Sequence, residues 1–290
     1  MNGHKKIACF SLWRDSERHI RRTLLQLESI IEEHPHVEFY WFFYTNDNKD
    51  DTAKILEDWI RNKKGKVLNE ELGAKKFGST PQKERMVNLS IFRNKCKSMI
   101  RGKEYKDTQF DLAFIFDSDL EFTKEDFKAL GRCYSENKGA VMVTANCRQN
   151  IPDYVFNKYK DSYYDVFCFR DAFGNEGIYF TNFPSLLEID QEDYEAGKPV
   201  KIMSGFGGMA IANINAYNMC FYSSVGGSEH VNFCYQMSKL GDILSCPQAQ
   251  PRTYTDYATI NIENIKKIAE ERERARFKLA NELFYRSCSQ

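Results

Sequence analysis

One stretch near the middle of the chain constrains the fold more than any other. The five residues of Leu112–Phe116 are largely apolar, which is typical of a strand buried on both faces of a sheet that helices cover. Asp117 and Asp119 follow directly. Side chains two positions apart in an extended segment point the same way, so these carboxylates can converge on one hard cation such as Mg²⁺ or Mn²⁺. The alternative is a strand that runs into an Asp-rich turn or helix cap.

Strand and helix patterns alternate along the chain, and this order predicts an α/β fold with a parallel sheet and right-handed crossovers. Strands are expected at 6–13, 37–44 and 140–145, and helices at 17–33, around 55–60, at 84–101 and at 124–136. A later helix is expected to start near Glu229 and to end at Gly241 as its C-cap, and Ser16 is expected to cap the first helix.

Three other regions lack a clear pattern or stand apart. Residues 62–84 are polar and rich in Lys and Gly, which predicts a loop. Residues 146–199 lose periodicity, and a long irregular insertion in a compact domain is more often functional than idle. Residues 260–286 read as a charged amphipathic helix, either a solvated brace or an oligomer contact.

Composition excludes several classes of protein. The 290 residues are enough for a large α/β domain, and 41 basic residues balance 41 acidic ones, which argues against a general nucleic-acid binder. The nine cysteines show no C-x-x-C pair and no zinc spacing, so a reducing compartment is expected. No signal peptide and no apolar run near 18 residues is visible, so we expect a soluble, cytoplasmic protein.

Two segments after the carboxylate pair carry candidate chemistry. Gly205, Gly207 and Gly208 precede an apolar strand and would let the backbone approach a ligand closely, unless they form only a tight turn. Glu229 is a candidate general base, and the alternative is a carboxylate that the helix dipole stabilises. His230 is the only histidine after the carboxylate pair, and it is either a ligand or base, or a structural residue.

These pieces, in this order, resemble a GT-A glycosyltransferase. Residues 45–52, Thr-Asn-Asp-Asn-Lys-Asp-Asp-Thr, look like that family's Asn-Asp-Ser-x-Asp-x-Thr loop, which implies that Asn46 and Asp47 contact the nucleoside. Arg93-Asn94 resembles the pair that supports the diphosphate. The resemblance also implies that Asp119 ligates the metal directly, and that Asp117 and Ser118 lie beside the metal and the nucleotide.

The later motifs extend the resemblance. Gly205–Gly208 is similar to a glycine loop near the donor and acceptor sugars, and Glu229 begins a segment like the family's Glu-Asp helix. His230 stands where an Asp is usual, so the base and the choice between inversion and retention stay open; a third metal ligand is also implied there. Residues 163–171 are similar to a segment of fungal capsule mannosyltransferases, so Asp165, Arg170 and Asp171 are candidates for ordering the acceptor loop; the alternative is an internal salt-bridge network.

The layout is also similar to the fungal mannan polymerase family and to soluble relatives from large DNA viruses of algae, for which the host cytoplasm would be the location. The resemblance implies a GT-A, Rossmann-like, mostly parallel sheet. The expected domain covers 1–258, with a nucleotide half at 1–145 and an acceptor half at 146–258, and a C-terminal helix at 259–290. Asp256 is a spare candidate metal ligand.

The resemblance implies a metal-dependent transferase, with Mn²⁺ or Mg²⁺, that moves a sugar from a UDP- or GDP-sugar to a hydroxyl of a glycan or glycoprotein acceptor. One alternative is a sugar-phosphate nucleotidyltransferase, which would need a glycine-rich loop after the first strand, whereas Ser11–Ser16 contains no glycine. The other is a non-catalytic scaffold. The sequence leaves open the donor sugar, the base, the acceptor, the linkage and the oligomeric state.

Overall fold

The computed structural model describes residues 5–77, 82–153, 158–176, 188–225 and 227–253. These described residues belong to one compact unit. The expected helix over 260–286, the expected domain boundary at 258 and the candidate ligand Asp256 lie outside them. Within the described part of the chain, no helix is both long enough and apolar enough to cross a membrane.

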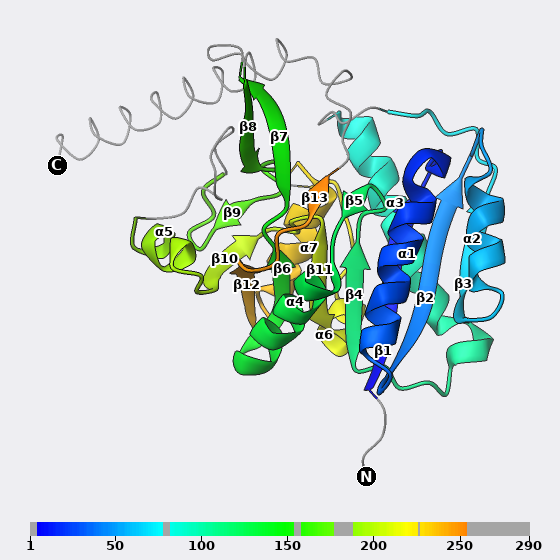
Figure 1. Ribbon diagram of the computed structural model, residues 1–290, viewed down its shortest axis with the longest axis horizontal. Helices are drawn as coiled ribbons and strands as arrows, with labels where there is room; N and C mark the ends of the chain where they lie inside the picture. Colours follow the sequence, from blue (N-terminus) through cyan, green and yellow to red (C-terminus); the bar gives the residue numbers. More distant parts are fainter. Residues whose placement is uncertain (1–4, 78–81, 154–157, 177–187, 226, 254–290) are drawn as a thin grey trace. The chain divides into compact units, whose positions relative to one another are not determined.

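A nine-stranded sheet forms the centre of the fold (Figure 1). Its strand order is β3-β2-β1-β4-β11-β6-β12-β10-β9. The strands are β1 (Lys5–Trp13), β2 (Val37–Asn46), β3 (Lys64–Glu70), β4 (Leu112–Phe116), β6 (Ala140–Ala145), β9 (Arg170–Asp171), β10 (Val200–Ser204), β11 (Met209–Asn213) and β12 (Asp242–Cys246). Only β10 and β11 run against the direction of the others in this described sheet, so the predicted mostly parallel sheet is confirmed.

Helices cover both faces of this sheet because its strands alternate their side chains. Along β1, Ile7 and Cys9 enter one apolar core, and Ala8 and Phe10 enter the other. The first core also receives α1 (Glu17–Glu33), α2 (Thr52–Ile60) and α4 (Lys124–Glu136). The second receives α3 (Lys83–Ser98), α6 (Ile214–Met219) and α7 (Glu229–Met237). The molecule is therefore a three-layer α/β fold, as the alternating pattern predicts.

Residues 62–84 are not a continuous loop, and that prediction is wrong. They contain β3, which pairs in parallel with β2 from Tyr40 opposite Lys64 to Asn46 opposite Glu70. Because β3 is the outer strand of the sheet, Lys64 and Lys66 are exposed at its edge. Lysine on an edge strand discourages pairing with other chains, and the same polar composition hides the strand in the sequence.

Residues 146–199 are also more regular than predicted. They contain β7 (Arg148–Asp153) and β8 (Lys158–Tyr163), which pair in antiparallel register, together with β9 and α5 (Glu188–Glu195). A second sheet has the order β5-β13-β7-β8, with β5 (Leu120–Glu121) and β13 (Arg252–Thr253). The sequences of β7 and β8 are mostly polar, so backbone pairing rather than apolar alternation holds them, and the periodicity gives no signal.

Two expected helix caps differ from the structure. Ser16 lies at the N-cap position of α1, but its hydroxyl donates to the carbonyl of Arg14 at 3.2 Å and makes no capping bond. Gly241 is not the C-cap of α7, which ends at Met237 with Ser238 as its C-cap. A Cβ at Gly241 would lie 2.5 Å from Cγ1 of Val141, so this glycine is needed for close packing against β6.

Candidate active site

The two carboxylates after β4 lie at the edge of the sheet where ligands of such folds bind. The strands β1, β2 and β4 are parallel neighbours, so their carboxyl ends share one edge. The N–H of Asp117 donates to the carbonyl of Gly208 at 2.8 Å, which joins the end of β4 to the turn before β11. Asp117 and Asp119 are both partly buried there. Ser118 contributes its carbonyl, which accepts a hydrogen bond from Thr23 at 3.1 Å.

Arg93 of α3 connects this carboxylate pair to α7. Its Nη2 donates to Oδ1 of Asp117 at 2.9 Å, and its Nε donates to Oε1 of Glu229 at 3.0 Å. The side chains of Arg93 and Glu229 are only 8% and 4% exposed, so this ion pair is shielded from water. Asp117, a candidate metal ligand, and Glu229, a candidate catalytic residue, therefore bind one guanidinium group, that of Arg93.

Aromatic rings pack around Arg93 and His230. The Cζ atom of Arg93 lies 5.1 Å from the ring centroid of Phe206 and 5.8 Å from that of Tyr222. The His230 ring stacks on Phe206 at 4.1 Å and meets Tyr222 edge-on at 5.5 Å. Both ring nitrogens of His230 are buried without a hydrogen-bond partner among the described residues. The nearest acid to His230 is Glu229, with 3.6 Å between Nε2 and Oε1.

The carboxylates of the site differ in their affinity for protons. Burial, together with the charge of Asp119, raises the pKa of Asp117 to about 6, although Arg93 opposes this rise. Burial also raises the pKa of Asp119. Burial acts to raise the pKa of Glu229, but the charges of His230 and Arg93 outweigh it and lower that pKa to about 2. Burial and Arg93 lower the pKa of His230 to about 3, so at pH 7 Arg93 is the cation that keeps Glu229 ionised.

A divalent cation fits the donor set formed by Asp117 and Asp119. Both groups are carboxylates with raised pKa values, so a nearby cation would relieve the cost of ionising them. Among the described residues, no group of three or more His, Cys, Asp or Glu side chains is placed to hold a metal ion. Asp117, Asp119 and His230 therefore do not form a three-ligand set. A cation held by few carboxylates takes its remaining ligands from water and substrate oxygens.

Asp47, the candidate nucleoside ligand, is engaged by the protein itself. Its Oδ1 accepts hydrogen bonds from the N–H groups of Leu72 and Gly73, both at 2.7 Å. Its Oδ2 accepts from the N–H of Ala74 at 3.0 Å and from Nδ2 of Asn46 at 2.6 Å. An ionised carboxylate has about four acceptor sites, so these bonds fill Asp47. The two candidates Asn46 and Asp47 thus hold the segment after β3.

The glycine turn between β10 and β11 is fixed by Asp165. Its Oδ2 accepts from the N–H groups of Phe206 at 3.1 Å and Gly207 at 2.7 Å, and from the thiol of Cys168 at 2.6 Å. Burial raises the pKa of Asp165 to about 6. Gly207 has φ +61°, and a Cβ there would lie 1.7 Å from the carbonyl oxygen of Ala145. A glycine is therefore required at position 207. Asp165 contributes to the site indirectly, because it holds the turn that carries Phe206 and Gly207.

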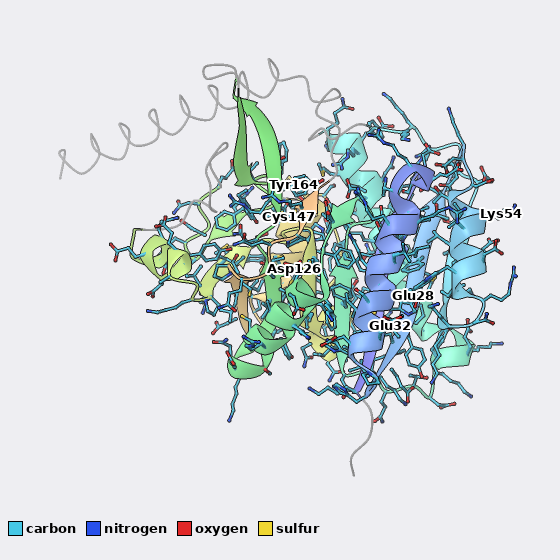
Figure 2. All side chains as sticks on the ribbon, viewed as in Figure 1. Glu28, Glu32, Lys54, Asp126, Cys147 and Tyr164 are labelled. Atoms are coloured by element: carbon cyan, nitrogen blue, oxygen red, sulfur yellow. The ribbon has the colours of Figure 1, made fainter. Side chains whose placement is uncertain are left out.

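Other contacts connect the Asp165 segment to the central sheet. The N–H of Tyr164 donates to the carbonyl of Cys147 at 2.9 Å, just beyond β6. Figure 2 labels both residues close together, above Asp126 of α4. Gly208 has φ +74°, and a Cβ there would meet Leu120 at 3.0 Å. Gly205 is less constrained, because its nearest contact is the flexible end of a side chain, Cδ1 of Ile202 at 2.7 Å.

Arg170 and Asp171 bind within their own loop. Arg170 donates to Glu176 at 2.9 Å and to the carbonyl of Phe169 at 2.7 Å. Asp171 accepts from the N–H groups of Phe173 at 2.9 Å and Asn175 at 2.8 Å. The hydrogen bonds that their side chains make with described residues all stay within 167–176, so these side chains order this segment and do not bind Asp117.

Sequence reasoning missed three residues that the structure places at or near the site. Phe206 lies within the predicted glycine turn, so its place in the sequence could have indicated that it is near the site. Arg14 follows β1 and donates to the carbonyl of Ala74 at 2.6 Å, with 4.0 Å between its Nη2 and Asp47. Tyr222 lies between two helices and carries no local signal, because only long-range contacts bring it to Arg93.

Known proteins resemble this chain in fold and in family. The mannosyltransferase PcManGT from Pyrobaculum calidifontis, solved in complex with GDP-Man and Mn²⁺, aligns with a TM-score of 0.53 at 8% identity, over 90% of this chain and 60% of that one. TarS 1–349 from S. aureus, solved with UDP, aligns with a TM-score of 0.49 at 14% identity, over 86% of this chain and 60% of that one. The chain thus spans about 60% of the length of these solved chains.

The likeness to PcManGT confirms the predicted GT-A fold. No curated protein gives a significant match. The sequence profile of the family described as Cryptococcal mannosyltransferase 1 matches residues 12–281, which bears out the predicted resemblance to capsule mannosyltransferases at the level of the family. Since this match covers most of the 290 residues, the chain belongs to the cryptococcal mannosyltransferase 1 family.

Proposed function

We propose that the protein is a metal-dependent glycosyltransferase that moves a sugar from a nucleoside-diphosphate sugar to a hydroxyl of a glycan acceptor. Family membership and the GT-A fold support the reaction class. The observation that carries the proposal is the Arg93 bridge between Asp117 and Glu229 beside Asp119. It gathers a candidate metal pair, an anion-binding cation and a further carboxylate at the ligand-binding edge of the sheet.

The charge balance of this cluster supports a requirement for metal. Asp117, Asp119 and Glu229 carry three negative charges when ionised, and the positive charges that act on them are those of Arg93 and Arg85. A diphosphate entering this edge would meet a net negative field. A divalent cation on Asp117 and Asp119 would offset that negative charge and, when bound, would stabilise the charge that develops on the leaving diphosphate. Mn²⁺ is the cation to test first, and Mg²⁺ the second.

The chain's own residues then have distinct roles. Asp119 and Asp117 hold the cation, and Arg93 donates to the diphosphate. Glu229 is tied to Arg93 and has a low pKa, so it is better suited to orienting a sugar than to accepting a proton. His230 is neutral at pH 7, and neither of its ring nitrogens has a hydrogen-bond partner in the part of the chain that the structure describes, which suits a hydrogen bond to a bound ligand.

GDP-mannose is the donor that we propose to test first. PcManGT was solved in complex with GDP-Man and Mn²⁺, and the matched family is described as a mannosyltransferase. UDP-sugars are the second choice, since TarS was solved with UDP. In either case, Asn46, Asp47 and the segment they hold would lie against the nucleoside.

The test is calorimetric titration of GDP and UDP, each with and without Mn²⁺, into wild type and Asp119→Ala. We expect one nucleotide to bind only with Mn²⁺, and Asp119→Ala to lose that binding while it keeps its melting temperature. Release of mannose from GDP-mannose would then report the activity. If neither nucleotide binds to the folded wild type with Mn²⁺ present, the transferase proposal is wrong and the protein is a scaffold that keeps the fold.

A further inference from the structure

The three residues Cys220–Tyr222 follow α6 without regular secondary structure, yet side chains bind nearly all of their backbone groups. Lys97 donates to the carbonyl of Cys220. The N–H of Phe221 donates to Oε1 of Gln236 at 3.1 Å, and Nε2 of Gln236 donates to the carbonyl of Phe221 at 2.9 Å. Asn94 binds both backbone groups of Tyr222, with its Oδ1 3.0 Å from the N–H nitrogen and its Nδ2 2.8 Å from the carbonyl. The backbone of this segment is therefore fixed by α3 on one side and α7 on the other.

The fixed segment delivers the ring of Tyr222 to the site. This ring is 3% exposed, stacks on Phe233 with 4.2 Å between centroids, and meets His230 edge-on. Its centroid lies 5.8 Å from Cζ of Arg93. Asn94 and Arg93 are neighbours on α3, so one turn of that helix both holds Tyr222 and receives its ring.

Arg93 depends on these surroundings because two of its nitrogens are already bound. Nε donates to Glu229 and Nη2 donates to Asp117, whereas Nη1 makes no hydrogen bond to any described residue. The rings of Tyr222 and Phe206 exclude water from the guanidinium, which strengthens its ion pairs and restricts its rotation. Nη1 remains as the donor for an anionic ligand.

We propose that Tyr222, held by Asn94, is a positioning residue that fixes Arg93 between Asp117 and Glu229 and leaves Nη1 available to the donor diphosphate. The inference rests on the proposed function, since it names the residue through which that same site orders its anion-binding group. Tyr222 need not touch the nucleotide. It acts through Arg93, so the effect of replacing Tyr222 on nucleotide affinity should depend on whether Arg93 is present.

The test combines Tyr222→Leu and Tyr222→Phe with Arg93→Lys. Affinity for GDP and for UDP with Mn²⁺ is measured by calorimetry, and folding is checked by thermal melting. We expect Tyr222→Leu to weaken nucleotide binding about tenfold and Tyr222→Phe to stay within about twofold, because the phenylalanine ring keeps the contact with Arg93. In the Arg93→Lys background, Tyr222→Leu should change the affinity less than about twofold, because the group through which it acts has gone.

Substitutions of Asn94 give an independent route if Tyr222→Leu does not fold. Asn94→Asp keeps the acceptor for the Tyr222 N–H and loses the donor, and Asn94→Ala loses both. We expect a graded loss of affinity, with Asn94→Asp between wild type and Asn94→Ala. Equal losses from Tyr222→Leu with and without Arg93→Lys would overturn the inference. A wild type that binds no nucleotide would instead overturn the proposed function, so the two failures are distinguishable.

Discussion

Arg93 and Glu229 are 136 positions apart in the chain, and they form a buried ion pair with 3.0 Å between Nε and Oε1. Glu229 also accepts from the hydroxyl of Ser228 at 3.2 Å. The pair links α3 to α7 and fixes the carboxylate in its ionised form. It is therefore both a structural contact and part of the site.

Replacement of Arg93 by Gln should leave Glu229 buried without its cation. We expect the free energy of unfolding to fall by about 3–5 kcal/mol, because an unpaired buried charge costs far more than a pair is worth. Urea titration at pH 7 measures the change. Adding Glu229→Gln to the same chain should recover part of the loss, because Glu229 then carries no charge, whereas Asp117 still lacks its partner. A single variant as stable as wild type would show that the pair is open to water.

Gly207→Ala should destabilise the protein more than Gly73→Ala. Both glycines have similar positive φ angles, +61° and +64°, but only Gly207 places a Cβ against backbone, while Gly73 has nothing within 4 Å. The strain of a left-handed residue is about 1–2 kcal/mol, which we expect for Gly73→Ala. Gly207→Ala adds an overlap with Ala145 that only backbone movement can relieve. Thermal melts of both variants test this, and equal losses would contradict it.

Asp165→Asn should change how stability depends on pH. The folded pKa of Asp165 is about 6, above its ordinary value of 3.8, so its favourable contribution is full below pH 4 and is lost as pH rises through 6. The amide oxygen of Asn can still accept the three bonds made to Oδ2. Between pH 4 and 7 the variant should gain about 2–3 kcal/mol relative to wild type. Denaturant titrations across this range give the difference, and parallel curves would refute the assignment.

Much of the fold was predictable because amphipathic patterns decide it locally. The helices at Glu17–Glu33 and Lys124–Glu136 start and end as predicted, the latter at a capping box formed by Thr123 and Asp126. The strand at Ala140–Ala145 is also as predicted. The polar strands β3, β7 and β8 were not predictable, because backbone pairing stabilises them and their sequences show no apolar alternation.

The residues of the site likewise differ in how far the sequence predicts them. Asp117 and Asp119 follow a strand, so the rule for parallel sheets predicts their edge. Arg93 and Glu229 are far apart in sequence, so their contact cannot be predicted from local patterns. Only the family resemblance assigns both residues to one site before the structure is known. Tyr222 has neither a motif nor a pattern. The engagement of Asp47 by residues 72–74 depends on β3, which the sequence does not reveal.

Asp47→Ala should release the segment after β3. The N–H groups of 72–74 then lose their acceptor, and their hydrogen exchange should accelerate at least tenfold relative to wild type. Asp47→Asn is the graded control, because one carbonyl oxygen can keep part of these bonds. Mass spectrometry of peptides covering these residues reports both. Unchanged exchange in Asp47→Ala would show that the segment is held by other contacts.

The antiparallel strand β11 affects how the sheet can form while the chain is being translated. β4 pairs with β1 on one side and with β11 on the other, but Met209–Asn213 is made long after Leu112–Phe116. While the ribosome adds the intervening chain, the most apolar strand of the sheet has one edge without its partner. Such an edge can pair with other nascent chains. The free edge of β4 is thus open to such pairing until Met209–Asn213 has been made.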